Sequence, residues 1–260
     1  MAGSEESSER LEDIEIRRLR DHAEYRATLE VQQWVWGFSE SDCVPPRLMI
    51  VADEIGGLAL GAFSGGEMIG FSLSFPGRAE ADPASNRQVY WHSHMTGVLP
   101  EWQGRGVGRR IKLSQRDEAL RAGIEVVEWT FDPLEIRNAY FNIERLGIIV
   151  RHFLSNQYGI TSSRLHGGLP TDRLVAEWHV GSDQVAAVIE RAPRDRAEVD
   201  TTIEVPKTIA DLRVSDSEAA REIQTRVRDQ FQRAFAERLT VVGYRLEEDA
   251  GVYELGRPAR

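Results

Sequence analysis

The sequence predicts a mixed α/β fold, in which helices flank a central sheet and an α/β extension follows towards the C-terminus. Three observations predict it. Short apolar or alternating segments of strand type recur between longer segments of helical composition. Ser64-Gly65-Gly66 joins two strand-like segments as a hairpin turn would. An apolar segment ending at Pro100 leads through three alternate glycines, at positions 104, 106 and 108, directly into a helical segment.

The first part of the chain predicts alternating strands and helices. Asp21 is expected to cap the first helix, because an aspartate oxygen can accept from the free N–H groups of the first turn. Pro45-Pro46 should interrupt the chain after that helix, and Gly147 should end the third. In order, the expected elements are a strand at 14–19, a helix from Asp21 to about Trp36, strands at 58–63, 67–75 and 88–99, a helix at 109–121, a strand at 125–131, a helix at 134–146 and a strand at 148–153.

The second part of the chain carries weaker signals and has no second glycine turn. It predicts a strand at 172–180, helices at 185–192 and 216–238, and strands at 202–205, 239–246 and 251–255. We therefore expect a disordered tail over residues 1–11, a main domain over 12–158 and a C-terminal α/β extension over 159–260. The extension either completes the sheet of the main domain or forms a second subdomain.

Composition limits the functions that the chain could have. With 260 residues, 41% of them hydrophobic, it can bury a large core. Its net charge of −10 argues against an extended surface for nucleic acid, which would need clustered positive charge. No apolar run has the length of a membrane span. A single cysteine, Cys43, excludes an internal disulfide and fits a reducing, cytoplasmic location; it is either a nucleophile or a small buried side chain.

The three glycines predict a phosphate-binding turn. Without a Cβ, successive backbone N–H groups can turn inward around an anion at the positive end of the following helix. A local concentration of basic residues supports a small anionic ligand, although such residues also form the ordinary solvated face of a helix. They are Arg105, Arg109, Arg110, Lys112 and Arg116.

Two familiar phosphate motifs do not match this turn. The P-loop of nucleotide triphosphatases ends in Gly-Lys-Ser/Thr, and that ending is absent here. A dinucleotide fingerprint needs its third glycine one residue later, where Arg109 stands. Written as Gln103-x-x-Gly106-x-Gly108, the turn instead resembles the acyl-CoA-binding signature of the GCN5-related N-acyltransferase (GNAT) superfamily, over roughly residues 12–158.

The resemblance implies a GNAT-like sheet and a set of coenzyme A ligands. Backbone N–H groups from Gly104 to Arg109 should hold the pyrophosphate of acetyl-CoA or another acyl-CoA. The end of the preceding strand should pair with the pantetheine arm, and its thioester should lie between Val98 and the strand at 125–131. The implied ligands are Val98, Leu99, Gln103, Gly104, Arg105, Gly106, Val107, Gly108, Arg109 and, from the helix at 134–146, Asn138.

Two histidines precede the turn on the same strand. Alternation places Tyr90, His92, His94 and Thr96 on one face and Trp91, Ser93, Met95 and Gly97 on the other. An amine must lose a proton before it can attack a thioester, and histidine can accept one near neutral pH. The His-x-His spacing is similar to that of the arylalkylamine N-acetyltransferases. This implies His94 as general base and His92 as its relay; both could instead be hydrogen-bonded core or pocket residues.

The helix at 134–146 departs from the family pattern. The family commonly has a tyrosine four residues before the glycine that ends this helix, where it protonates the leaving thiolate. That position is Ile143 here, and Tyr140 is the nearest alternative acid. Because a thiol has a pKa of about 8.5, coenzyme A is a tolerable leaving group even without a dedicated acid.

Two functions follow from the sequence. The first is an N-acyltransferase that moves an acetyl, succinyl or other acyl group from acyl-CoA directly to the amine of a small molecule or amino acid. The second is a non-catalytic acyl-CoA sensor or assembly module, which the missing tyrosine suggests. We expect no metal, because no Cys, Asp or Glu pattern completes a site with the two histidines. Nucleic acid and membrane partners are not expected, and a homodimer stays open.

Overall fold

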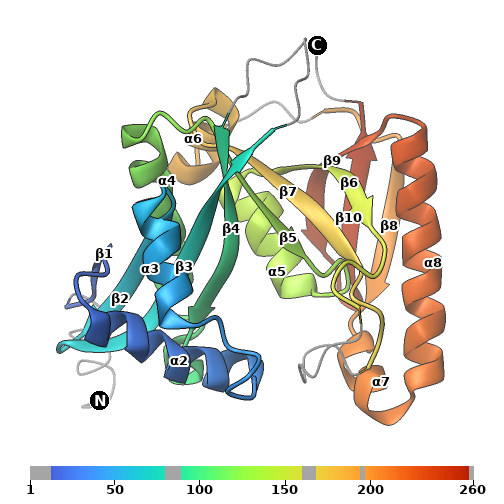
Figure 1. Ribbon diagram of the computed structural model, residues 1–260. Coiled ribbons are helices and arrows are strands. Elements are labelled where there is room, and N and C mark those ends of the chain that lie inside the picture. Colours follow the sequence, from blue (N-terminus) through green and yellow to red (C-terminus); the bar gives the residue numbers. More distant parts are fainter. Residues whose placement is uncertain (1–12, 80–88, 160–167, 194–196, 258–260) are drawn as a thin grey trace, which may run out of the picture. The chain divides into compact units, whose positions relative to one another are not determined.

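The computed structural model describes residues 13–79, 89–159, 168–193 and 197–257, which form two compact units (Figure 1). The first unit comprises residues 1–127 and the second residues 128–260. The tail predicted over residues 1–11 lies outside the described residues. The division into a main domain at 12–158 and a C-terminal extension at 159–260 stays a prediction.

The first unit is built on an antiparallel meander. Its strands are β1 (Glu15–Arg18), β2 (Leu58–Ser64), β3 (Glu67–Arg78) and β4 (Val89–Val98), which pair in that order. The hairpin between β2 and β3 turns at Gly65 and Gly66, both in the left-handed region that glycine adopts without strain. The strands predicted from the sequence, and their order, are therefore confirmed for this unit.

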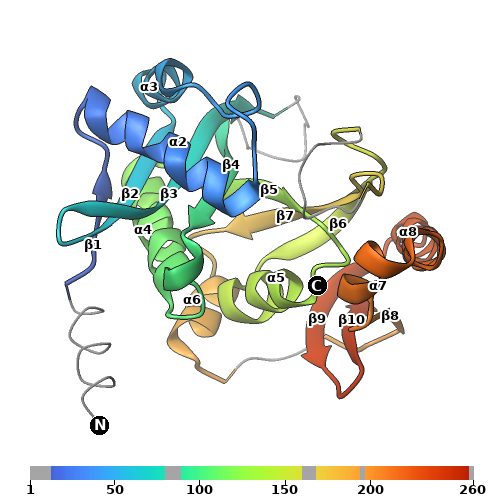
Figure 2. The ribbon, with the colours of Figure 1, turned by 90° about the horizontal axis from the view of Figure 1, so that it is seen from below.

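Helices cover both faces of the meander (Figure 2). On one face lie α2 (His22–Trp36) and α3 (Pro46–Glu54), which share an apolar cluster with Phe71, Leu73 and Met95 of the sheet. On the other lies α4 (Val107–Arg121), whose Val107 and Ile111 pack against Ala62 and Ile69. The alternating strands thus bury both of their faces.

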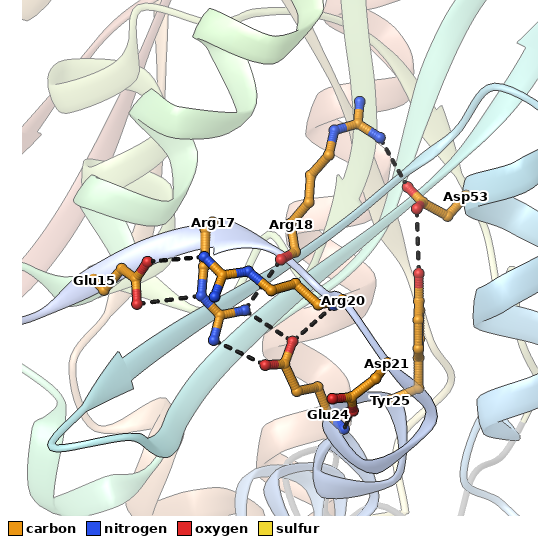
Figure 3. A network of polar contacts seen from close by, with 8 residues as sticks. All are labelled: Glu15, Arg17, Arg18, Arg20, Asp21, Glu24, Tyr25 and Asp53. Carbon is orange, nitrogen blue, oxygen red and sulfur yellow. Dashed lines mark hydrogen bonds and ion pairs between the residues drawn. The ribbon is translucent and has the colours of Figure 1, made fainter.

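A polar network fixes β1 to the two helices of one face (Figure 3). Asp21 caps α2 as predicted, accepting from the N–H of Glu24 at 3.0 Å. Arg17 of β1 donates twice to the carboxylate of Glu24, at 2.8 Å each. Asp53 of α3 accepts from Arg18 and from the Tyr25 hydroxyl. The first strand, although only four residues long, is thereby held at the edge of the sheet.

The second unit contains a sheet of its own in the order β5, β7, β6, β9, β10, β8. The strands are β5 (Val126–Phe131), which begins in the last two residues of the first unit, β6 (Ile149–Leu154), β7 (Arg173–His179), β8 (Thr201–Pro206), β9 (Thr240–Leu246) and β10 (Ala250–Gly256). Val150 of β6 pairs with Val241 of β9, so β9, β10 and β8 continue the sheet beyond β6.

Within the described residues, five helical segments accompany this sheet. They are α5 (Ile136–Tyr140), the π-helical segment η2 (Phe141–Leu146), α6 (Asp183–Glu190), α7 (Ile209–Ser215) and α8 (Ser217–Ala236). Phe231 of α8 packs against Phe153 and Tyr253. Gly147 ends η2 in the left-handed conformation, as predicted for the end of the 134–146 helix.

Three segments differ from the sequence-based prediction. No helix was expected between Pro45-Pro46 and the strand at 58–63, but α3 lies there, with Pro46 in its first turn, where a missing N–H costs no helical hydrogen bond. The strand predicted at 67–75 is longer than expected, because β3 continues to Arg78. Its pairing with β2 ends at Ser74 while its pairing with β4 continues, so Pro76 lies where β3 is an edge strand and a missing N–H costs no ladder bond. The seven-residue helix α7 was not expected, because it is short and lacks a side-chain N-cap.

Gly57, which precedes β2, marks a close approach of backbone to backbone. A Cβ at this position would meet the carbonyl oxygens of Ala52 and Ser74, neither of which can move as a side chain could. We expect Gly57→Ala to lower the free energy of unfolding by roughly 3 kcal/mol, measured by urea denaturation.

Gly65→Ala provides the control. Its Cβ would meet nothing within 4 Å, and only the left-handed backbone, at a φ of +57°, opposes it. The expected loss is about 1 kcal/mol. Equal losses for the two variants would contradict the close packing described at Gly57.

Candidate functional site

The glycine turn connects β4 to α4 through the short helical segment η1 (Pro100–Trp102). Gly104 and Gly106 have φ values of +73° and +84°, and Gly106 is the N-cap of α4, with no side chain capping the helix. The first N–H groups of a helix have no partner inside it. An uncapped helix start that is exposed and preceded by left-handed glycines is a geometry that can hold a phosphate.

Val107 anchors the turn to the core. Its side chain is almost fully buried against Ile111, so only its backbone N–H is directed to the turn. Arg105 and Gln103 are exposed, and the Arg105 guanidinium lies 5.5 Å from the centre of the Trp102 ring. The Gln103 amide donates back to the carbonyl of Val98 at 2.9 Å, which ties the turn to the strand before it.

At the end of β4, the N–H of Val98 faces away from β3. The N–H of Leu99 donates to Ile69 of β3, and its carbonyl accepts from Trp102. Because backbone groups alternate between the two edges of a strand, the N–H of Val98 points to the opposite edge. Of the two residues predicted to pair with pantetheine, Val98 is therefore the one whose N–H faces away from the meander.

A β-bulge interrupts β4 at His94. Leu73 pairs with Met95 and Ser74 with Ser93, which leaves His94 without an opposite residue in β3. The His94 ring meets the Phe75 ring edge-on, with the two ring centres 5.7 Å apart. The centre of the His92 ring lies 6.2 Å from that of His94. The two histidines therefore do share one face, as predicted.

The bulge changes the rest of the predicted alternation. Thr96 was expected on the face of the histidines and Ser93 on the opposite one. Instead both approach Ser72, because Thr96 shares a hydrogen bond with it at 3.1 Å and Gln115 of α4 bonds both Ser72 and Ser93. The inserted residue moves every side chain after it to the opposite face of the strand. No pattern in the sequence of β4 itself shows where this change occurs.

The surroundings of His94 favour the uncharged form of its ring. Part of its side chain is exposed to solvent, but the protein around the ring removes hydration, and His92 adds repulsion. Together they lower the pKa of His94 below its usual 6.5. Near neutral pH the ring is uncharged and can accept a proton.

Lys112 was predicted to belong to the basic face around the turn, and this interpretation is wrong. The side chain is buried under β4, where its ammonium donates to the Ser93 hydroxyl and to the Gln115 side-chain oxygen, at 3.0 Å each. Burial lowers the pKa of Lys112 to about 7. The helical spacing of Ile111, Gln115 and Ala119 marks the buried face of α4, and Lys112 borders it.

The remaining predicted site residues belong to the second unit. Asn138 is exposed on α5, and its side-chain oxygen accepts from Asn142 at 3.2 Å. Tyr140 ends α5 and is half-buried. Ile143, at the family's tyrosine position, is buried in η2. Roles for Asn138 and Tyr140 stay predictions.

Other reactive groups give weaker signals. Burial first, and the neighbouring acidic residues second, raise the pKa of the Cys43 thiol, which fits a small buried side chain rather than a nucleophile. Within the described residues, no group of three or more His, Cys, Asp or Glu side chains could hold a metal ion. In the same part of the chain, no helix is both long and apolar enough to cross a membrane.

Solved structures resemble this chain, although no family model and no curated protein matches its sequence. A GNAT-family protein from Desulfovibrio desulfuricans is 14% identical, with a TM-score of 0.51, over 65% of this chain and 99% of its own. The ribosomal-protein-S18-alanine N-acetyltransferase of Escherichia coli is 15% identical, with a TM-score of 0.50, over 65% of this chain and 95% of its own. Arabidopsis thaliana NAA60, solved with a bisubstrate analogue, is 12% identical, with a TM-score of 0.51, over 64% of this chain and 97% of its own.

The likeness covers nearly the whole of each of these structures but about two thirds of this chain. It shows that the chain contains the GNAT fold, which confirms the predicted fold class. At 12 to 15% identity it assigns no substrate and no catalytic residue.

The buried lysine makes stability depend on pH. Its pKa is about 7 in the folded state and about 10.4 when unfolded, so the unfolded state binds more protons between these values. The stabilisation is complete above the unfolded pKa and is lost as the pH falls towards 7. We expect the free energy of unfolding to rise by roughly 3 kcal/mol from pH 7 to pH 10 relative to Lys112→Met, measured by urea denaturation at each pH.

Lys112→Met also removes two hydrogen bonds, which shifts the free energy of unfolding by a similar amount at every pH, so only the slope is diagnostic. Arg116→Met, one helical turn further along α4, is the control and should keep the slope of the unmodified protein. Identical slopes for the protein and Lys112→Met would contradict the lowered pKa.

Proposed function

We propose that this protein is an acyl-CoA-dependent N-acyltransferase, which transfers an acyl group directly to the amine of a small molecule or amino acid. The observation that carries the proposal is the uncapped start of α4, with left-handed Gly104 and Gly106 before it. The GNAT fold, in which this turn follows β4, supports the same function. Acetyl-CoA and succinyl-CoA are the donors that we would test first.

The turn fits the pyrophosphate of coenzyme A. Backbone N–H groups from Gly104 to Arg109 supply donors at the positive end of the α4 dipole. At Gly108 a Cβ would have only one neighbour within 4 Å, a methyl group of Val98 at 3.9 Å, so the space above this glycine is open to a ligand. Gln103 and Arg105 border the turn, and we propose Asn138 as a further ligand from α5.

The chemistry requires a base and a stabilised oxyanion. In the proposed step the amine nitrogen attacks the thioester carbon, His94 accepts the amine proton directly or through His92, and the C–S bond breaks to release coenzyme A as a thiolate. The Val98 N–H, which points away from β3, is the proposed donor to the developing oxyanion. A proton from Tyr140 or from solvent completes the thiol, since Ile143 cannot supply one.

Gly108→Ala separates cofactor binding from folding. Replacing a helical glycine by alanine should stabilise α4 by up to about 1 kcal/mol, because the space is open. The same methyl group should collide with the bound pyrophosphate and weaken coenzyme A binding at least about tenfold, measured by calorimetry.

Gly123→Ala, at the other end of α4, is the matched control. It should lose about 1 kcal/mol because its φ of +71° is strained for alanine, yet bind coenzyme A normally. Unchanged binding by Gly108→Ala would refute the placement of the pyrophosphate at this turn.

His94→Gln tests the base. Glutamine keeps a polar side chain of similar length but accepts no proton at neutral pH, so kcat should fall about 100-fold. In the unmodified protein kcat should rise with pH, and the midpoint of this rise should lie below the usual histidine pKa of 6.5, because the pKa of His94 is lowered. Thiol release with a panel of amines and amino acids, using each acyl-CoA separately, measures both.

The control for His94→Gln is His22→Gln, an exposed substitution at the start of α2 that should leave the rate unchanged. A His94→Gln rate within a few-fold of the unmodified protein would reject the role of this residue. Tight binding of coenzyme A without turnover of any acceptor would favour the non-catalytic sensor.

A further inference from the structure

The helix α5 that carries Asn138 and Tyr140 has little stability of its own. It contains five residues, no side chain caps its start, and it passes directly into the π-helical segment η2. Isolated helices of this length do not persist in water, and π-helical geometry is rarer and less favourable than α. Its position must therefore come from contacts with other parts of the second unit.

Three such contacts come from residues 209–256. At the start of α5, Arg213 of α7 donates to Asp132 at 2.7 Å and pairs with Glu135. Asp132 also accepts from the N–H of Leu134 at 2.8 Å, so the arginine holds the residue that orders the turn into the helix. Arg213 and Asp132 are both buried, where an ion pair is screened little by salt.

The other two contacts come from the closing hairpin. The Tyr253 hydroxyl of β10 donates to the carbonyl of Pro133 at 2.8 Å, and Tyr253 itself is fully buried. At the far end, the N–H of Tyr244 in β9 donates to the Glu144 carboxylate of η2 at 2.9 Å. Helix α5 and η2 are thus held before their first residue and near their last.

We infer that this part of the extension is a clamp that positions α5 for coenzyme A, with Arg213 and Tyr253 as positioning residues. The inference rests on the proposed function and on Asn138 as a ligand from this helix. Residues 209–256 then serve to position Asn138 and do not form an independent module. A helix that is held at both ends keeps a side chain such as Asn138 in register, and small displacements of such groups are costly.

Tyr244 and Tyr253, whose rings meet edge to face, provide a matched test. Tyr244 and Tyr253 are both buried, with ring centres 4.7 Å apart, and each loses a single hydroxyl on substitution by phenylalanine. Only the Tyr253 hydroxyl reaches Pro133; the Tyr244 hydroxyl has no hydrogen-bond partner within the described residues. We expect Tyr253→Phe to weaken coenzyme A binding about threefold or more. Tyr244→Phe should leave it unchanged, because Tyr244 contacts Glu144 through its backbone N–H, which phenylalanine keeps.

A second pair tests the arginine. Arg213→Met should weaken coenzyme A binding at least about tenfold, and Arg213→Lys should restore part of it. Arg228→Met is its control, because Arg228 of α8 also pairs with a buried carboxylate, donating twice to Asp172, whereas its hydrogen bonds within the described residues do not reach α5. Calorimetry gives the dissociation constant, and thermal unfolding of each variant shows whether the two arginine variants lose comparable stability.

Each outcome decides the clamp separately from the proposed function. Normal binding by Tyr253→Phe and Arg213→Met, or equal weakening in both members of either pair, would overturn the clamp. So would an Asn138→Ala variant that binds coenzyme A normally, because the clamp would then position no ligand. Failure of the unmodified protein to bind coenzyme A would instead overturn the proposed function.

Discussion

The first unit depends on one buried polar contact, in which Lys112 and Gln115 of α4 reach serines of β3 and β4. A polar group in a protein interior is costly unless it is fully paired, so this contact admits few alternative arrangements of helix and sheet. Small serines at the contact let the two approach closely. Because α4 begins at the glycine turn and the contact meets β4 at the bulge, the same interaction sets both the phosphate turn and the histidine pair.

Local signals in the sequence were enough to predict most of the first unit. Asp21 caps its helix, the Ser64-Gly65-Gly66 turn makes its hairpin, and the glycines lead into α4, because each depends on neighbouring residues only. The bulge at His94 could not be predicted in this way, since it is a difference in length between β4 and its partner strand. The buried position of Lys112 was missed for a similar reason: what a lysine faces is decided by the serines of distant strands.

In the second unit the important contacts join residues that are far apart in the chain. Asp132 and Arg213 are 81 positions apart, and Pro133 and Tyr253 are 120 apart, so nothing in either local sequence announces the partner. The sequence did show one feature of the helix that these contacts hold. Ile143 stands where the resemblance to the GNAT superfamily predicts a tyrosine. Ile143 is an apolar core residue, and it packs the π-helical segment where a hydroxyl would have needed solvent or a partner.

The pairing of β6 with β9 affects the order in which the chain can fold during synthesis. In the first unit every strand pairs with its neighbour in sequence, so each partner is available soon after it leaves the ribosome. In the second unit Val150 must wait for Val241, and β8 must wait for β10. A nascent chain that ends before β9 therefore carries a β6 whose edge towards β9 is unpaired, the kind of edge that invites association with other chains.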